Sequence, residues 1–481
     1  MCTCNVCQYE TPMKSEACCP ALLIAAPASG QGKTTVTSAL AHLLAARGKR
    51  VRVFKCGPDF LDPTWLALAS GQPVDNLDLA MCGRSDIEQR LAQAAADSDV
   101  ILVEAVMGLF DGTRSAADIA ALWNLPVLLV IDASAMAETF GALAFGLANY
   151  RPGLRIAGVL ANRVASERHA QMLRRSVTPD VRWLGHLPRQ NASGQKPMPS
   201  RHLGLLPADE LHDAQDRLAE LAQSLGQSDL GQLPWEDWLA HWQVQFPAPA
   251  TGSAGDAAAT ENGLLSGRTI AIARDAAFSF IYPANLAFLQ AQGARLAFFS
   301  PLAGDPLPAC DALWLPGGYP ELHTEALGRR QDLAVQIGAH WQAGKPIWAE
   351  CGGMLALMRE LHWPARELRA PLLGVIPGEV TQHQRLQGLG MQGWQSPWGL
   401  LRGHGFHHSS CETSLPVLGH TQRLIDEHEL DAQSRLEPVY SQGSLRASYF
   451  HAWFPSNPRA AAGLFTAPDP TTSPLPGSAS A

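Results

Sequence analysis

The chain has 481 residues, of which 46% are hydrophobic and 17% are charged, a composition typical of a globular protein with two or three domains. A net charge of −8 argues against a surface that binds nucleic acid. No apolar run approaches the roughly 18 residues that a membrane-spanning helix needs, and the N-terminal segment lacks the apolar core of a signal peptide. We therefore expect a cytoplasmic protein that binds neither nucleic acid nor membranes.

Residues 1–20 are predicted to be an N-terminal extension that carries Cys2, Cys4, Cys7, Cys18 and Cys19. The C-x-C-x2-C-x10-C-C spacing lacks the paired C-x2-C units of a zinc site. A disordered extension is therefore favoured, and a metal-handling segment is the alternative. The other cysteines are scattered, as is usual for reduced, buried thiols in an intracellular protein.

A strand–turn–helix–strand pattern begins at residue 21. Residues 21–26 predict a buried strand, residues 34–49 a helix and residues 50–56 a second strand. This order is typical of a βαβ unit in a parallel sheet. Further buried strands are predicted at residues 100–106, 127–131 and 156–162. We expect a doubly wound α/β domain over residues 21–245.

A second α/β domain follows a linker. Residues 246–266 are rich in Ala, Gly, Ser, Thr and Pro and lack apolar periodicity, which predicts a linker. The second domain is predicted over residues 267–459, and the composition of residues 460–481 predicts a disordered tail. Its expected strands lie at residues 268–278, 295–300, 312–318 and 346–350.

Residues 27–35 (PASGQGKTT) match the phosphate-binding pattern G-x-x-x-x-G-K-[ST], except that Pro27 stands at the first glycine. Gly30 and Gly32 allow backbone N–H groups to face an anion, and the helix that follows adds its dipole. Lys33 can reach the β- and γ-phosphates, and the Thr34 hydroxyl can bind Mg²⁺. Because the loop joins a predicted strand to a predicted helix, we expect nucleotide binding rather than a chance Gly-rich turn.

Acidic residues follow two other predicted strands of the first domain. Asp59 and Asp62 lie in KCGPDFLDP, and Glu104 and Asp111 lie in VEAVMGLFDG. The carboxyl ends of parallel strands converge on a ligand, so these carboxylates can hold Mg²⁺ or steer an acceptor. One or two of them can instead cap helices, and Asp111 before a glycine can be a turn residue. Glu104 is the strongest candidate, because an acid that ends an apolar strand needs a partner.

Cys351 stands between a predicted strand and a predicted helix in IWAECGGMLAL. A thiol near helix N–H groups is expected to have a lowered pKa, as in a nucleophile elbow. The N–H of Gly352 can face an oxyanion, and the upstream turn at Gly317 and Gly318 offers a second source of donors. His451, which ends a strand-like run, is the candidate base.

Eight segments, in this order along the chain, resemble the cobyrinic acid a,c-diamide synthase family over residues ~21–459. They are GKTTVTSAL, KCGPDFLDP, NLDLAMCG, VEAVMGLFDG, GVLANRV, LPGGYPE, AECGGMLAL and RGHGFHHS. The resemblance implies a P-loop, dethiobiotin-synthetase-like ATP domain joined to a class I glutamine amidotransferase domain. The implied reaction is ATP-dependent amidation of the a- and c-carboxylates of cobyrinic acid with ammonia from L-glutamine, through acyl phosphates, in cobalamin biosynthesis.

The resemblance also implies residue roles. The acceptor and phosphoryl-transfer site would contain Asp59, Asp62 and Asp111, and Mg²⁺ would bind Thr34 and Glu104. Cys351 would form the glutamyl thioester with His451 as its base. The partner is a corrinoid polycarboxylate, and a homodimer is an option. ATP would contact Ser29, Gly30, Gly32, Lys33, Thr34 and Thr35, with Asn162 and Arg163 near the adenine.

The chain departs from the family pattern at several positions. Besides Pro27, Trp453 stands where a second His of a His-x-His is common, and no carboxylate follows His451 as in many class I amidotransferases. The resembled family also works with a Cys–His pair. Gly405 and His408 replace a Glu and a Tyr in RGHGFHHS, which leaves the exact acceptor open.

Several alternatives stay open at this point. Hydrogenobyrinic acid or nickel-sirohydrochlorin can be the acceptor of the same reaction. Cobyric acid synthase shares the architecture but fits less well, because KCGPDFLDP is the diamide-synthase form. From a different class, the chain can be a P-loop switch protein with an inactive amidotransferase module.

Overall fold

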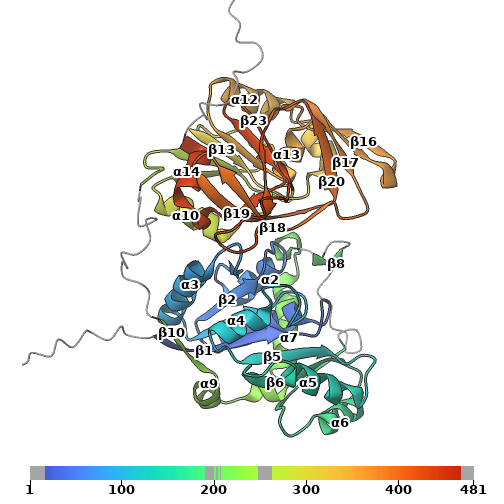
Figure 1. Cartoon of the computed structure of the whole chain (residues 1–481). Helices are drawn as coiled ribbons and strands as arrows, with labels where there is room; N and C mark the ends of the chain where they lie inside the picture. Colours follow the sequence, from blue (N-terminus) through green and yellow to red (C-terminus); the bar gives the residue numbers. More distant parts are fainter. Residues whose placement is uncertain (1–16, 190–199, 202–203, 206, 248–262, 467–481) are drawn as a thin grey trace, which may run out of the picture. The chain divides into compact units, whose positions relative to one another are not determined.

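The computed structural model describes residues 17–189, 200–201, 204–205, 207–247 and 263–466 (Figure 1). The chain divides into two compact units, and each is described by itself. The first unit comprises Met1–Val53, Glu88–Lys196 and Leu218–Ser253. The second comprises Phe54–Ile87, Pro197–Arg217 and Ala254–Ala481. Among the described residues, no helix combines the length and the apolar character needed to cross a membrane.

Of the described residues, the N-terminal half forms an eight-stranded sheet in the order β3-β2-β4-β1-β5-β6-β7, with β10 pairing β1. The β1–β4, β1–β5, β5–β6 and β6–β7 pairs are parallel, whereas β10 is antiparallel to β1. Parallel strands are buried on both faces, which explains their continuous apolar runs. The strands are β1 (Ala17–Ala25), β2 (Val51–Cys56), β3 (Asp75–Leu77), β4 (Val100–Glu104), β5 (Val127–Asp132), β6 (Ile156–Val164), β7 (Trp183–Pro188) and β10 (Gln243–Phe246).

Helices connect these strands, as the βαβ pattern predicts. They are α1 (Lys33–Ala46), α2 (Asp62–Ser70), α3 (Arg84–Asp97), α4 (Ala116–Leu122), α5 (Thr139–Asn149), α6 (Glu167–Ser176), α7 (Ala214–Leu225), α8 (Asp229–Gln232) and α9 (Trp235–His241). The start of α4 shows the local chemistry: Ser115 and Asp118 form a reciprocal capping box. Short strands β8 (Ser200–Arg201) and β9 (Gly204–Leu205) pair with each other.

The C-terminal part of the second unit has, within the described residues, a seven-stranded sheet in the order β12-β11-β13-β14-β24-β23-β21. Its strands are β11 (Thr269–Ala273), β12 (Arg295–Phe299), β13 (Ala312–Leu315), β14 (Ile347–Glu350), β21 (Val417–His420), β23 (Pro438–Gln442) and β24 (Leu445–Ser448). The helices are α10 (Pro283–Ala291), α11 (Thr324–Gly328), α12 (Gln331–Gln342), α13 (Gly352–Leu357) and α14 (Pro458–Thr466).

Smaller sheets follow α13, and the sequence did not predict them. One has the order β16-β15-β17-β20 and another the order β22-β18-β19-β25. Their strands are β15 (Glu360–Trp363), β16 (Leu368–Pro371), β17 (Gly378–Gln382), β18 (Gly388–Ser396), β19 (Gly399–His407), β20 (Ser409–Thr413), β22 (Gln422–Arg423) and β25 (His451–Ala452).

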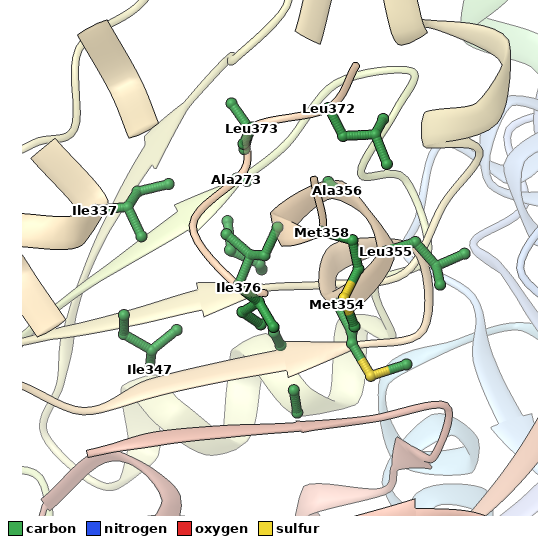
Figure 2. Packing of buried hydrophobic residues seen from close by; sticks show 14 of the residues in the cluster. Ala273, Ile337, Ile347, Met354, Leu355, Ala356, Met358, Leu372, Leu373 and Ile376 are labelled. Atoms are coloured by element: carbon green, nitrogen blue, oxygen red, sulfur yellow. The ribbon is translucent and has the colours of Figure 1, made fainter. Parts of the chain in front are cut away.

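Helix α13 is anchored in a hydrophobic core. Figure 2 shows its side chains among those of the neighbouring elements. All of its residues are buried, and apolar residues of β14, α12 and the segment after β16 belong to the same cluster. Burying such side chains stabilises by about 1.5–3 kcal/mol each. The core therefore fixes the point where β14 turns into α13. The labelled residues are Ala273, Ile337, Ile347, Met354, Leu355, Ala356, Met358, Leu372, Leu373 and Ile376.

Two predicted ends of structure are corrected. Strand β1 begins at Ala17, inside the predicted extension, because β10 supplies distant pairing partners and Cys19 is buried. Helix α14 runs to Thr466, past the predicted start of the tail at residue 460, because its apolar side chains join a core cluster. Cys2, Cys4 and Cys7, most of the linker and residues 467–481 lie outside the described residues.

We expect Phe465→Ala to destabilise the second unit by about 3–5 kcal/mol, because it removes a fully buried ring from α14. Urea unfolding followed by tryptophan fluorescence measures the change. Val335→Ala on α12, where the side chain is 72% exposed, is the control and should shift stability by less than about 0.5 kcal/mol. Equal effects of the two substitutions would contradict the placement of α14 in the core.

Candidate active site

The phosphate loop of the first unit joins β1 to α1. Gly30 and Gly32 have φ angles of 77° and 99°, a left-handed region that glycine enters without strain. Lys33 begins α1, and its Nζ donates to Ala28 O at 3.1 Å and to Met107 O at 2.6 Å. The ammonium group is thus held at the loop by carbonyls from both sides. Ser29 is exposed in the loop, and Thr35 is half-buried in the first turn of α1.

The hard oxygen donors of Thr34 and Glu104 lie side by side. Thr34 Oγ1 donates to Glu104 Oε1 at 2.8 Å, and Glu104 ends β4 with no solvent exposure. A hydroxyl and a carboxylate beside a phosphate loop form the donor set that Mg²⁺ prefers. These two residues therefore fit the predicted metal site.

Asn162, from β6, packs directly on the phosphate loop. Its Nδ2 donates to Gln31 O at 2.8 Å, and a Cβ at Gly32 would lie 2.0 Å from the same nitrogen. Arg163 has a φ of 59° and forms an ion pair with Asp132 at 2.5 Å. Asn162 thus supports the loop itself, and the contact of both residues with adenine stays a prediction.

Asp111 also lies at the phosphate loop. Its Oδ2 accepts from Gly108 N at 2.8 Å. A Cβ at Gly108 would lie 2.6 Å from both Asp111 Oδ2 and Pro27 O, so the turn after β4 packs against the loop. Asp111 shapes this turn, as one sequence-based interpretation held, and the residue is nevertheless exposed.

Asp59 and Asp62 belong to the second unit and share one buried cation. Lys55 Nζ lies 2.7 Å from Asp62 Oδ2 and 3.5 Å from Asp59 Oδ2, with 2% of the lysine side chain exposed. Asp59 Oδ1 accepts from the N–H groups of Leu61 and Asp62 at the start of α2. Burial and the neighbouring Asp62 raise the pKa of Asp59 to about 7. The acidic loop, residues 59–62, therefore holds two carboxyl groups close together around the Lys55 ammonium group.

Cys351 occupies a strained elbow between β14 and α13. Its φ of 43° and ψ of −110° are unusual for a residue with a side chain. Its N–H donates to Ser448 O at 2.7 Å, which ties the elbow to the end of β24. The structure thus has the strand-to-helix turn that the sequence predicts.

The Gly317–Gly318 turn lies against both the Cys351 elbow and the ring of His451, the candidate base. A Cβ at Gly352 would lie 2.7 Å from Gly318 N, and a Cβ at Gly317 would lie 2.4 Å from His451 Cε1. The Gly317–Gly318 turn therefore contacts both the elbow and the imidazole. The predicted N–H donors and the predicted base surround one small region.

His451 lies in β25 and is enclosed by rings. Its ring centroid lies 4.9 Å from that of His404, 5.3 Å from Phe60 and 6.1 Å from Phe280. Its Nδ1 is buried and has no hydrogen-bond partner among the described residues. Sequence reasoning missed these rings, because their contact with His451 depends on tertiary packing.

Burial sets the protonation of both candidate catalytic groups. It raises the pKa of the Cys351 thiol, with Glu321 adding to the effect, which corrects the expected lowering by the helix N-terminus. Burial and the nearby His404 and His407 lower the pKa of His451. Both shifts favour the neutral thiol and the neutral imidazole at pH 7.

The fold and these sites define a P-loop nucleotide-binding protein joined to a glutamine amidotransferase. Residues 22–201 match the CobQ/CobB/MinD/ParA nucleotide binding domain, and residues 269–459 match the CobB/CobQ-like glutamine amidotransferase domain. These matches confirm the predicted fold class.

Relatives cover nearly the whole chain. A hydrogenobyrinate a,c-diamide synthase of Stutzerimonas stutzeri is 54% identical over 93% of this chain and 98% of its own. A hydrogenobyrinate a,c-diamide synthase of Pseudomonas aeruginosa is 50% identical over 94% of this chain and 98% of its own. A cobyrinate a,c-diamide synthase of Herminiimonas arsenicoxydans is 46% identical over 92% and 96%. The chain belongs to the a,c-diamide synthase family, a family of glutamine-dependent ligases, as its motifs predict.

We expect Gly317→Ala to lower glutamine hydrolysis by about 100-fold or more, because the new Cβ would collide with His451 Cε1, the predicted base, and displace a predicted oxyanion donor. Glutamate release measures the effect. Gly338→Ala in α12, where a Cβ meets open space, is the matched control and should keep the wild-type rate. A variant at Gly317 with normal hydrolysis would contradict this arrangement of turn and base.

Proposed function

We propose that the chain amidates the a- and c-carboxylates of a corrinoid polycarboxylate, using ATP and ammonia from L-glutamine, in cobalamin biosynthesis. The observation that carries the proposal is the presence, in one chain, of a phosphate loop with its oxygen donor pair and a cysteine elbow with its base. Family membership over nearly the full length supports the same reaction.

In the glutaminase half-reaction, Cys351 Sγ attacks the side-chain amide carbon of glutamine. His451 takes the thiol proton and passes it to the departing nitrogen, so that neutral ammonia leaves and a thioester forms. The N–H groups of Gly352 and the Gly317–Gly318 turn stabilise the oxyanion. Water then hydrolyses the thioester to glutamate. A low pKa at His451 suits this role, because the imidazole must be neutral to accept a proton.

In the synthetase half-reaction, a carboxylate oxygen of the acceptor attacks the γ-phosphorus of ATP, and ADP leaves. Ammonia then attacks the acyl phosphate, and phosphate leaves as the amide forms. Lys33 stabilises charge on the transferred phosphoryl group. Thr34 and Glu104 would hold Mg²⁺, which neutralises phosphate oxygens.

Asp59, Asp62 and Asp111 would position the acceptor and the reacting carboxylate. Asn162 supports the phosphate loop through its hydrogen bond to Gln31 O, and Arg163 follows Asn162 in β6.

The identity of the acceptor is the finer part of the proposal. Of the relatives described above, the pair with higher identity is named for hydrogenobyrinate and the third for cobyrinate. We therefore propose hydrogenobyrinic acid as the first acceptor to test and cobyrinic acid as the second. Nickel-sirohydrochlorin remains a comparison substrate. A homodimer remains a prediction.

We expect Cys351→Ser to lose glutamine-dependent amidation by at least about 1,000-fold, because a hydroxyl is a far weaker nucleophile in this elbow. Ammonium should restore amidation, since it bypasses the thioester. The assay follows glutamate release and acceptor mass with Mg²⁺-ATP and each acceptor. An active diamide synthase gives losses of about one mass unit at each of the a and c positions.

Cys310→Ser is the matched control, because this thiol is also buried and its Sγ lies 3.7 Å from His340 Nδ1, a histidine without a proposed catalytic role. It should hydrolyse glutamine within about threefold of the wild-type rate. Active glutaminase with each corrinoid unchanged would direct the search to other tetrapyrroles. If the wild-type chain hydrolyses no glutamine under any of these conditions, the result would contradict the proposal and favour a P-loop switch protein with an inactive amidotransferase module.

We expect Glu104→Gln to lower ammonium-dependent amidation by about 100-fold or more and to raise the Mg²⁺ requirement, because it removes a carboxylate ligand. Glutamine hydrolysis without acceptor should persist. Titration of Mg²⁺ at saturating ATP measures the shift. Glu138→Gln, an exposed acid in the same unit, is the control. An unchanged Mg²⁺ dependence in Glu104→Gln would remove this residue from the proposed metal site.

A further inference from the structure

Within the part of the chain that the structure describes, no carboxylate is hydrogen-bonded to Nδ1 of His451, the base of the proposed glutaminase. His451 Nδ1 lacks a hydrogen-bond partner among the described residues. Two residues along, where a carboxylate would complete a triad, Trp453 instead donates its Nε1–H to Asp86 Oδ2 at 3.1 Å. Something other than a ring hydrogen bond must therefore set the position of the imidazole.

A different buried carboxyl lies next to the nucleophile. Glu350 ends β14, immediately before Cys351, and is 2% exposed. Its Oε1 accepts from Trp348 Nε1 at 2.7 Å and from Ala452 N at 3.2 Å. Ala452 follows His451 in β25. A single side chain thus connects the residue before the nucleophile to the residue after the base.

The carbonyl group of Ala452 is also held by a buried side chain. Asn285 of α10 is 1% exposed, and its Nδ2 donates to Ala452 O at 2.8 Å. Its Oδ1 accepts from Phe454 N at 2.8 Å. Strand β25 is short, so its ladder with β19 alone offers little support. Glu350 and Asn285 supply contacts that this two-residue strand does not make.

We propose that Glu350 is a positioning residue for His451: by accepting the Ala452 N–H, it holds the short strand of the base at a fixed distance from the elbow of Cys351. The proposal rests on the glutaminase roles proposed for Cys351 and His451. Glu350 does at the backbone what a third carboxylate does at the imidazole ring. A displacement of about 1 Å in a proton-transfer pair can cost about 100-fold in rate, so such a fixed backbone contact matters.

The acceptor atom, rather than a negative charge, carries this role. Burial raises the pKa of Glu350 to about 8, so the carboxyl is protonated at neutral pH. A glutamine amide has the same shape and keeps a carbonyl oxygen that accepts from both donors. Glu350→Gln should therefore rescue what a side chain without an acceptor loses.

The test compares Glu350→Met with Glu350→Gln in the full chain. Methionine keeps the volume and removes the acceptor, and we expect its kcat for glutamine hydrolysis to fall by about 10- to 100-fold with KM within about threefold. Glu350→Gln should stay within about threefold of wild type. Inactivation of Cys351 by a glutamine-analogue alkylating agent should slow in parallel. Ammonium-dependent amidation should be unchanged in both variants, which shows that the chain has folded.

Thr421→Val is the control for the loss of a buried hydrogen bond. Thr421 is fully buried in the same unit, and its Oγ1 donates to Gln392 Oε1 at 2.7 Å. Gln392 lies on β18, which is separated from β25 by β19. It should lower the melting temperature without lowering kcat. Equal kcat losses in Glu350→Met and Thr421→Val would overturn the proposal, as would a Glu350→Gln variant as impaired as Glu350→Met.

If Glu350→Met does not fold, the milder variant Trp348→Phe tests the proposal in its place. It removes the Nε1 donor that orients the Glu350 carboxyl and keeps an aromatic ring facing Trp394. A fall in kcat of about threefold or more at unchanged KM supports the proposal, and an unchanged kcat overturns it. If wild-type and Cys351→Ser chains hydrolyse glutamine equally, the proposed glutaminase roles fail instead, and that result is separate from these outcomes.

Discussion

The strained backbone of Cys351 is the constraint on which the proposed amidotransferase site depends. A φ of 43° with a side chain attached is unfavourable by about 1–3 kcal/mol, so the surrounding structure must enforce it. The buried side chains of α13 do so from one side (Figure 2). The close approach of Gly352 to Gly318 does so from the other. The glycines of the motif are therefore packing requirements as much as sources of N–H groups.

The enclosure that enforces the elbow also determines the chemistry. It raises the pKa of the thiol and lowers that of His451, so the resting pair is neutral rather than an ion pair. A neutral pair avoids the cost of burying separated charges. In the proposed mechanism, the same enclosure places a heavier demand on geometry, because the proton would move to the imidazole as the thiol attacks. Fixed backbone contacts around His451 are thus a consequence of burial.

The sequence predicted features that are local and missed features that are not. The phosphate loop, the Glu104 strand end and the cysteine elbow each occupy one short segment, and their residue types determine the local backbone. The burial of Phe465 and the start of β1 at Ala17 depend on partners far along the chain. The direction of the Cys351 pKa shift was wrong for the same reason. Helix N–H groups are visible in the sequence, whereas desolvation arises from the whole fold.

The acidic loop and the base are linked through packed rings inside the second unit. Phe60 lies between Asp59 and Asp62, and its ring stacks on Phe280 at 4.9 Å and lies 5.3 Å from His451. Interiors packed this closely transmit displacement, because an aromatic ring cannot move without moving its neighbours. The loop that carries Asp59 and Asp62, two of the residues proposed to position the acceptor, therefore packs in one cluster with His451, the base proposed to release ammonia. A displacement of the Asp59–Asp62 loop within this unit is therefore expected to be felt at His451.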